Sequence, residues 1–101
     1  MGTTVTSLAI ARDHPAYEGH FPERPILPAV VLLGEALAAV EAATGRGPEA
    51  WTLASAKFLQ PVTPGTALTL SHETLASGAM RFEIRSAAAL VAHGVFAPRD
   101  P

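Results

Sequence analysis

The sequence has 101 residues, a length that fits one domain, and a formal net charge of −2 without a block of basic residues. This charge balance argues against a nucleic-acid binder, because such proteins gain most of their affinity from clustered lysine and arginine. The chain has no cysteine, which excludes disulfides and thiolate zinc sites. Its longest apolar run, residues 26–33, includes a proline and is far shorter than the roughly 20 apolar residues of a membrane-spanning helix.

The composition is apolar for so small a domain, with 49% hydrophobic and 16% charged residues. A domain of this size buries only about 60–70% of the surface that its unfolded chain exposes, so association with a second subunit would stabilise it. We therefore expect residues 1–101 to form a single domain that hides apolar surface in an oligomer. The N-terminus lacks the charged segment and apolar core of a signal peptide, and a cytoplasmic location is expected.

The first predicted element is a strand over residues 3–11, which are rich in β-branched side chains. Alternation places four of its side chains on one face, namely Thr4, Thr6, Leu8 and Ile10. A turn is predicted at residues 12–15, where His14 is interpreted as a solvated loop residue.

Residues 17–28 are predicted to form a rigid loop, because they contain Pro22, Pro25 and Pro28. Each proline fixes φ and removes an amide donor, so the loop loses little entropy on folding and can hold a side chain in place. His20 is the side chain in this loop that titrates near neutral pH. The loop is therefore a candidate site, and a purely structural proline-rich connector is the alternative.

A helix is predicted to open at Pro28 and Ala29 and to run to about Thr44, where glycines follow as stop signals. Apolar residues occur nearly all the way round this helix, which predicts burial on most sides. Gly34 lies in mid-helix, where glycine costs about 1 kcal/mol relative to alanine. We expect close packing against Gly34 to explain its presence.

Four strands are predicted after the helix, over residues 51–59, 66–74, 80–85 and 87–97, the last broken by Gly94. The third of these four alternates most clearly between apolar and charged residues and should have one wet face. An order of strand, helix and four strands favours an α+β fold with an antiparallel sheet. His72 lies on the apolar face of its strand and is interpreted as a hydrogen-bonded core residue, and His93 similarly. No ligand spacing supports a metal site with either.

Two segments carry a family resemblance. The sequence GHFPERPILPAVVLLGEA, residues 19–36, resembles the GHFPxxPxxPGVxxxE segment of hot-dog-fold 3-hydroxyacyl-[acyl carrier protein] dehydratases and of related small dehydratase-like proteins of aryl-polyene and similar pathways. The sequence KFLQPVTPG, residues 57–65, is similar to the RFxxPVxPGD segment of the same family. The resemblance implies a hot-dog fold, in which a curved antiparallel sheet wraps around one central apolar helix.

The resemblance also implies a reaction, the loss of water from a 3-hydroxyacyl thioester to give a trans-2-enoyl thioester, without metal or cofactor. His20 matches the family's base, and an imidazole suits removal of an α-proton near neutral pH. Ala29 replaces the glycine whose amide stabilises the enolate-like oxygen in the family. Phe21, Pro28, Ala29 and Gly34 are carried over as residues that contact the substrate.

The sequence differs from the family at the position of the catalytic acid. The family's Glu or Asp occupies the position of Gly34, and Glu35 is the next residue. Consecutive residues of a helix are rotated by about 100° about its axis, so the Glu35 carboxylate points to a different side of the helix than a side chain at position 34 would. Glu35 is either the catalytic acid, if the helix is rotated or reaches a partner's site, or a buried or interface glutamate paired with an arginine such as Arg24.

The implied partners are an acyl carrier protein or CoA thioester and a second subunit. In the family, two subunits pair their sheets and the active sites lie between them, so we expect a homodimer or higher oligomer, or else a heterodimer. Arg81 and Arg85 are candidates for docking an acidic carrier protein. Two alternatives to a working dehydratase in fatty-acid or polyene-type biosynthesis stay open. One is a catalytically impaired hot-dog protein with Gly34 in place of the acid, which binds acyl carriers or acts as the partner subunit of a heterodimer. The other is an acyl thioesterase that uses Glu35.

Overall fold

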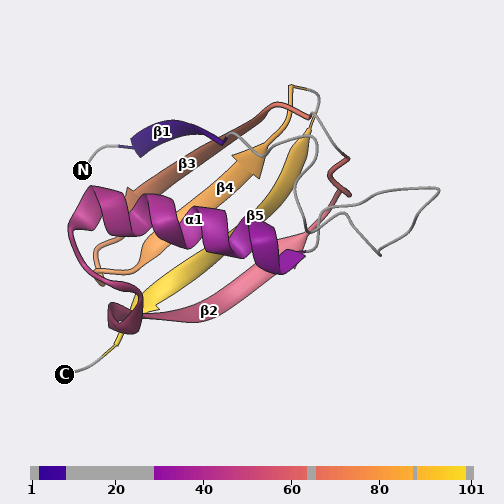
Figure 1. Ribbon diagram of the computed structural model, residues 1–101. Coiled ribbons are helices and arrows are strands. Elements are labelled where there is room, and N and C mark those ends of the chain that lie inside the picture. The colour runs from indigo at the N-terminus through magenta and orange to yellow at the C-terminus, as the bar shows by residue number, and fades with distance from the viewer. Residues whose placement is uncertain (1–2, 9–28, 64–65, 88, 100–101) are drawn as a thin grey trace.

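The protein is described by a computed structural model, which covers residues 3–8, 29–63, 66–87 and 89–99. These residues form one antiparallel sheet crossed on one face by a helix (Figure 1). Its elements in chain order are β1 (Thr3–Leu8), α1 (Ala29–Thr44), the 3-10 helix η2 (Pro48–Ala50), β2 (Trp51–Phe58), β3 (Leu68–Thr74), β4 (Met80–Arg85) and β5 (Leu90–Pro98). The predicted order of elements is confirmed, and η2 is an addition. No described helix has the length and hydropathy needed to cross a bilayer.

The sheet has the strand order β1-β3-β4-β5-β2, and every neighbouring pair is antiparallel. The chain turns from β3 into β4 where predicted, because Gly78 takes a φ of 89° and its N–H donates to the Leu75 carbonyl oxygen at 2.9 Å. β2 precedes β3 in the sequence but pairs with β5 on the far side. This topology leaves β1 and β2 as the two edges of the sheet.

The helix α1 begins and ends as predicted, with Gly45 at a φ of 72° donating its N–H to the Glu41 carbonyl oxygen at 2.8 Å. The prediction of burial on most sides is wrong. Its buried residues form one stripe at i, i+4 spacing, Leu32, Ala36 and Val40. Val30 is 71% exposed. Alanines make the helix sequence apolar all round, but the sheet covers one side of it only.

The core lies between α1 and the sheet, and the alternation predicted for β3 and β4 is confirmed. Phe82 of β4 is 1% exposed and stacks on Phe96 of β5, with 5.0 Å between the ring centroids and 24° between the ring planes. Three further large apolar side chains are completely buried, Leu70, Ile84 and Val40. The core therefore joins α1 to the three central strands β3, β4 and β5.

The predicted break at Gly94 is wrong, because β5 continues through this residue. A Cβ atom at position 94 would overlap the Ser55 carbonyl oxygen and would lie 2.8 Å from Cζ of Phe82. Glycine is therefore required here for the close approach of β2 and of the Phe82 ring, rather than for a turn. The strand also begins at Leu90 instead of residue 87, because the Ser86 N–H bonds the Ala89 carbonyl oxygen at 2.9 Å in a turn.

The opposite face of the sheet, which we call the outer face, is polar and ion-paired. Glu83 accepts hydrogen bonds from Arg81 at 3.1 Å and from Arg85 at 2.8 Å, and Glu73 lies 3.7 Å from Arg81. The two arginine hydrogen bonds, Arg81 first, lower the pKa of Glu83. All four side chains are partly exposed, so water screens these pairs and each contributes little to stability.

Candidate active site

Three predicted site residues lie on α1 within the described part of the chain, namely Ala29, Gly34 and Glu35. The other three, His20, Phe21 and Pro28, lie outside the described residues, and their predicted roles stay predictions. The geometry of the candidate site is therefore built from the helix outward.

The N-terminus of α1 is at Ala29, the residue that replaces the family's oxyanion glycine. The first four N–H groups of a helix have no acceptor within it, and the aligned peptide dipoles give this end a partial positive charge. The first turn carries no acidic side chain to compensate that charge, and Ala29 itself is exposed. The backbone N–H groups at this end of the helix can therefore donate hydrogen bonds to an oxygen atom on which negative charge develops.

The position of the family acid, Gly34, is exposed and open. Within the described part of the chain, a Cβ atom built there meets nothing within 4 Å, so the prediction of close packing against Gly34 is wrong for these residues. Gly34 lies on the side of α1 away from the buried stripe that begins at Leu32. A side chain at position 34 would thus point away from the chain's own sheet.

Glu35 lies on the flank of the helix and is half-buried. Among the described residues, none forms a hydrogen bond or ion pair with its carboxylate. The alternative partner Arg24 lies outside the described residues, so that pairing stays a prediction. The structure brings Gly34 and Glu35 onto one helix but onto different sides of it, as the rotation of about 100° per residue requires.

The sequence predicted the strand over residues 51–59 but not its place at the edge of the sheet, where it lies as β2. All of its side chains except that of Trp51 are exposed, and Leu53 and Phe58 are 43% and 40% exposed. Their cross-strand neighbours on β5, Phe96 and Ala92, are buried in the core. The inner face of β2 is therefore apolar and uncovered in the single chain. The high apolar fraction of the sequence predicted that apolar surface is buried in an oligomer, but it did not indicate which element carries this surface.

The two described histidines differ from each other. His72 is 4% exposed on the core face, which confirms its predicted burial, but no described residue forms a hydrogen bond with its Nε2 atom. The expectation that it is hydrogen-bonded is wrong for this atom, and burial lowers the pKa of His72. His93 pairs in register with Glu83 and lies half-buried on the outer face, so its predicted core position is wrong. The continuous apolar run around it gave no alternation from which to assign a face.

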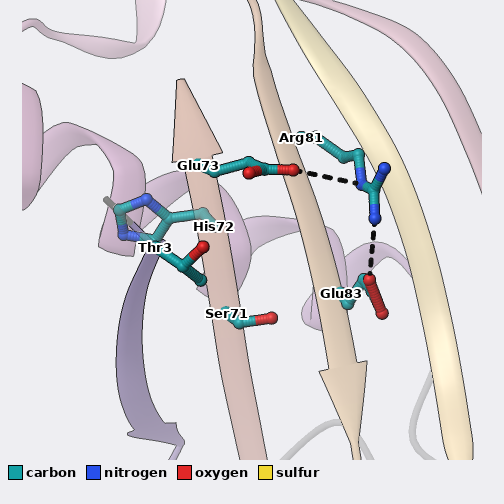
Figure 2. A pocket seen from close by; sticks show the side chains of 6 residues that line it. All are labelled: Thr3, Ser71, His72, Glu73, Arg81 and Glu83. Carbon is teal, nitrogen blue, oxygen red and sulfur yellow. Dashed lines mark hydrogen bonds and ion pairs between the residues drawn. The ribbon is translucent and has the colours of Figure 1, made fainter. Parts of the chain in front are cut away.

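The described strands form two shallow depressions, and neither is lined by Ala29, Gly34 or Glu35. One, of about 100 Å³, is lined by Thr3, Ser71, His72, Glu73, Arg81 and Glu83 (Figure 2). A second, of about 330 Å³, crosses β2, β4 and β5 and is lined by Ser55, Arg81, Glu83, Leu90, His93, Gly94 and Val95. Arg81 and Arg85, the candidates for docking a carrier protein, are both paired with glutamates there. Their charge is partly neutralised within the chain itself.

Curated relatives and solved structures point to the same family and fold. The chain is 38% identical over 72 residues to a 3-hydroxyacyl-[acyl-carrier-protein] dehydratase FabZ of Bartonella bacilliformis, covering 62% of this chain and 46% of the relative. It is 35% identical over 75 residues to the FabZ of Ruminiclostridium cellulolyticum, covering 67% of this chain and 53% of the relative. The chain thus spans about half the length of the curated relatives it matches.

Among solved structures, the dehydratase heterocomplex ApeI:P from Xenorhabdus doucetiae is similar at a TM-score of 0.80 and 20% identity, over 97% of this chain and 88% of that one. The fluoroacetyl-CoA thioesterase FlK is similar at a TM-score of 0.70 and 12% identity, over 94% and 82%. At such identities the likeness shows the fold, the predicted α+β hot-dog fold. The sequence profile of the ApeI-like group, described as ApeI dehydratase, matches residues 2–95. The chain therefore belongs to the ApeI-like dehydratase family.

Proposed function

We propose that this chain dehydrates 3-hydroxyacyl thioesters, carried on an acyl carrier protein or on CoA, to trans-2-enoyl thioesters at a site shared by two subunits. The family and the names of the curated relatives support the reaction class. The observation that supports the shared site is the direction of position 34, which points away from the chain's own sheet and meets none of the described residues within 4 Å. An acid at this position would serve a neighbouring subunit rather than its own.

In the proposed reaction, His20 takes the α-proton and the N–H of Ala29 donates to the thioester oxygen as negative charge develops there. A carboxylic acid then protonates the 3-hydroxyl group, which leaves as water. Each general acid or base raises the reaction rate by roughly 10²–10⁴-fold, so loss of the base or the acid should lower the rate of dehydration severely. Transfer of a proton from the imidazolium to the carboxylate through solvent returns both groups to their starting states. No metal or cofactor enters the proposed scheme.

The edge strand β2 supports the pairing of two subunits. An edge strand has a row of unpaired N–H and C=O groups, which an antiparallel strand of a second subunit can satisfy. Leu53 and Phe58 add uncovered apolar surface to this edge. Both a homodimer and a heterodimer with a related subunit would bury it.

The source of the acid decides between these assemblies. A homodimer has glycine at position 34 in both copies, so Glu35 would have to act as the acid. A heterodimer can supply an acid from the other subunit, and the ApeI:P dehydratase of known structure is itself a heterocomplex. Gly34 therefore favours a second candidate function, a subunit that completes the site of an acid-bearing partner and lacks elimination activity alone.

The test is turnover of a 3-hydroxybutyryl or crotonyl thioester by the purified chain, followed by the ultraviolet absorbance of the enoyl thioester. Turnover that His20→Ala and Glu35→Gln both abolish supports the homodimer. Turnover lost in His20→Ala but kept in Glu35→Gln assigns the acid to another group.

An inactive chain that gains turnover when mixed with an acid-bearing family member supports the heterodimer. Release of free thiol without an enoyl product would instead identify a thioesterase. Absence of any reaction in both settings refutes the proposal.

A further inference from the structure

His72 is a buried ionisable group that the proposed reaction does not use. It is 4% exposed, and its Nε2 atom has no hydrogen-bond partner in the part of the chain that the structure describes. Its cross-strand neighbours on the core face are Thr4 of β1 and Phe82 of β4, and neither titrates. A protonated imidazole at this position would be a buried charge without a partner, which is strongly unfavourable.

Among the described residues, the elements beside His72 present no counter-charge to such a proton. β1 contains no ionisable side chain, and the buried residues of the core cluster are all apolar. The ionisable side chains of α1, which crosses this face of the sheet, are Glu35 and Glu41, and both are partly exposed. Figure 2 shows the imidazole pointing away from the side on which Glu73, Arg81 and Glu83 meet. Burial alone lowers the pKa of His72.

The strand that covers this histidine on one side is weakly held. β1 is an edge strand that pairs with β3, and five of its six side chains are exposed. Elements with few buried side chains at the edge of a fold open locally at a lower free energy than the core does. Opening of β1 would let water reach the imidazole, whereas β4, on the other side of His72, is held by Phe82 in the core.

From these observations we infer that His72 makes the pairing of β1 with β3 acid-sensitive, so that protonation of the imidazole releases β1 before the rest of the sheet unfolds. The sign follows from proton linkage. The opened state has an ordinary histidine pKa of about 6.5 and binds the proton more tightly than the closed state, so acid favours opening. Between the pKa of His72 in the opened state and its pKa in the closed state, each unit by which the pH falls raises the equilibrium constant for opening about tenfold.

The experiment is amide hydrogen exchange on the full chain at about pH 7.5 and about pH 5.5, with rates corrected for the pH dependence of chemical exchange. We expect protection of the β1 amides to fall at the lower pH by up to about tenfold, while the β4 and β5 amides keep theirs. The matched variants are His72→Leu, which should remove the pH dependence, and His93→Leu on the outer face, which should leave it unchanged.

If His72→Leu does not fold, His72→Gln replaces it, because glutamine is polar but does not titrate in this range. Protection of β1 that does not depend on pH in the wild-type chain overturns the inference. So does a pH dependence that β1 shares equally with β4 and β5, or one that persists without His72.

Discussion

A single added methyl group should have opposite effects on stability at two glycines of this chain. At Gly94, the new Cβ would overlap the Ser55 carbonyl oxygen and lie 2.8 and 2.9 Å from two ring atoms of Phe82. Phe82 is 1% exposed and stacks on Phe96, so its ring has no space into which to move. Overpacking of this kind costs about 1–3 kcal/mol, and we expect Gly94→Ala to destabilise the fold by that amount.

At Gly34 the same change meets open space, since nothing lies within 4 Å of the new Cβ. The residue is in the interior of α1, where alanine is favoured over glycine by about 1 kcal/mol. We therefore expect Gly34→Ala to stabilise the fold by about 1 kcal/mol. The two variants should differ by about 2–4 kcal/mol, the sum of that gain and the cost at Gly94.

Urea denaturation and thermal unfolding measure both effects directly. For a domain of this size, 1 kcal/mol corresponds to a shift in Tm of about 4–8 °C. The slope of the denaturation curve should be unchanged in Gly34→Ala, because the surface exposed on unfolding is nearly the same. Destabilisation by Gly34→Ala would refute the open position of Gly34, and a neutral Gly94→Ala would refute the tight contact of β5 with β2.

Three further substitutions test the core, the outer face and the edge. Ile84→Ala removes a fully buried side chain and should cost about 2–5 kcal/mol in urea unfolding. Glu83→Gln should cost less than about 1 kcal/mol, and high salt should reduce this cost. Because Arg81 and Arg85 lower the pKa of Glu83, its contribution is present above the ordinary pKa of 4.5 and is lost as the pH falls through the folded value, which a series of unfolding curves at acid pH checks. Leu53→Lys on the exposed edge should change unfolding by less than about 1 kcal/mol but lower the dimer fraction in sedimentation experiments.

The sequence predicted most of the fold because its strands alternate clearly. Met80, Phe82 and Ile84 alternate with charged residues, and this pattern assigns both faces of β4 without reference to any partner. The bounds of α1 were also readable, since Gly45 supplies the left-handed stop that helices favour. These signals are local, so the sequence contains them completely.

The remaining features depend on what lies next to a residue in space. Alanines gave α1 an apolar sequence on every side, yet the sheet covers one stripe of it. Gly34 and Gly94 look alike in the sequence, but the first faces open space and the second faces the Phe82 ring. Likewise, the alternation around His72 predicted burial but could not show that Nε2 lacks a hydrogen-bond partner among the described residues.

For the candidate site, the sequence indicated the residue types, and the structure adds the direction of position 34. The resemblance implied that the active sites of this family lie between two subunits. The exposed side of α1 at Gly34 agrees with that arrangement, because a side chain at this position would point away from the sheet of its own subunit. The position of His20 relative to this helix stays a prediction, since its loop lies outside the described residues.

The most direct test of the shared site is the rate of 3-hydroxyacyl thioester dehydration by Gly34→Glu in a chain that also carries Glu35→Gln, relative to Glu35→Gln alone. The substitution installs a carboxylic acid at the open position, and a general acid contributes roughly 10²–10⁴-fold. We predict a rise of about 100-fold or more that His20→Ala abolishes in the same background. A folded, dimeric Gly34→Glu protein with no gain in rate would contradict the account.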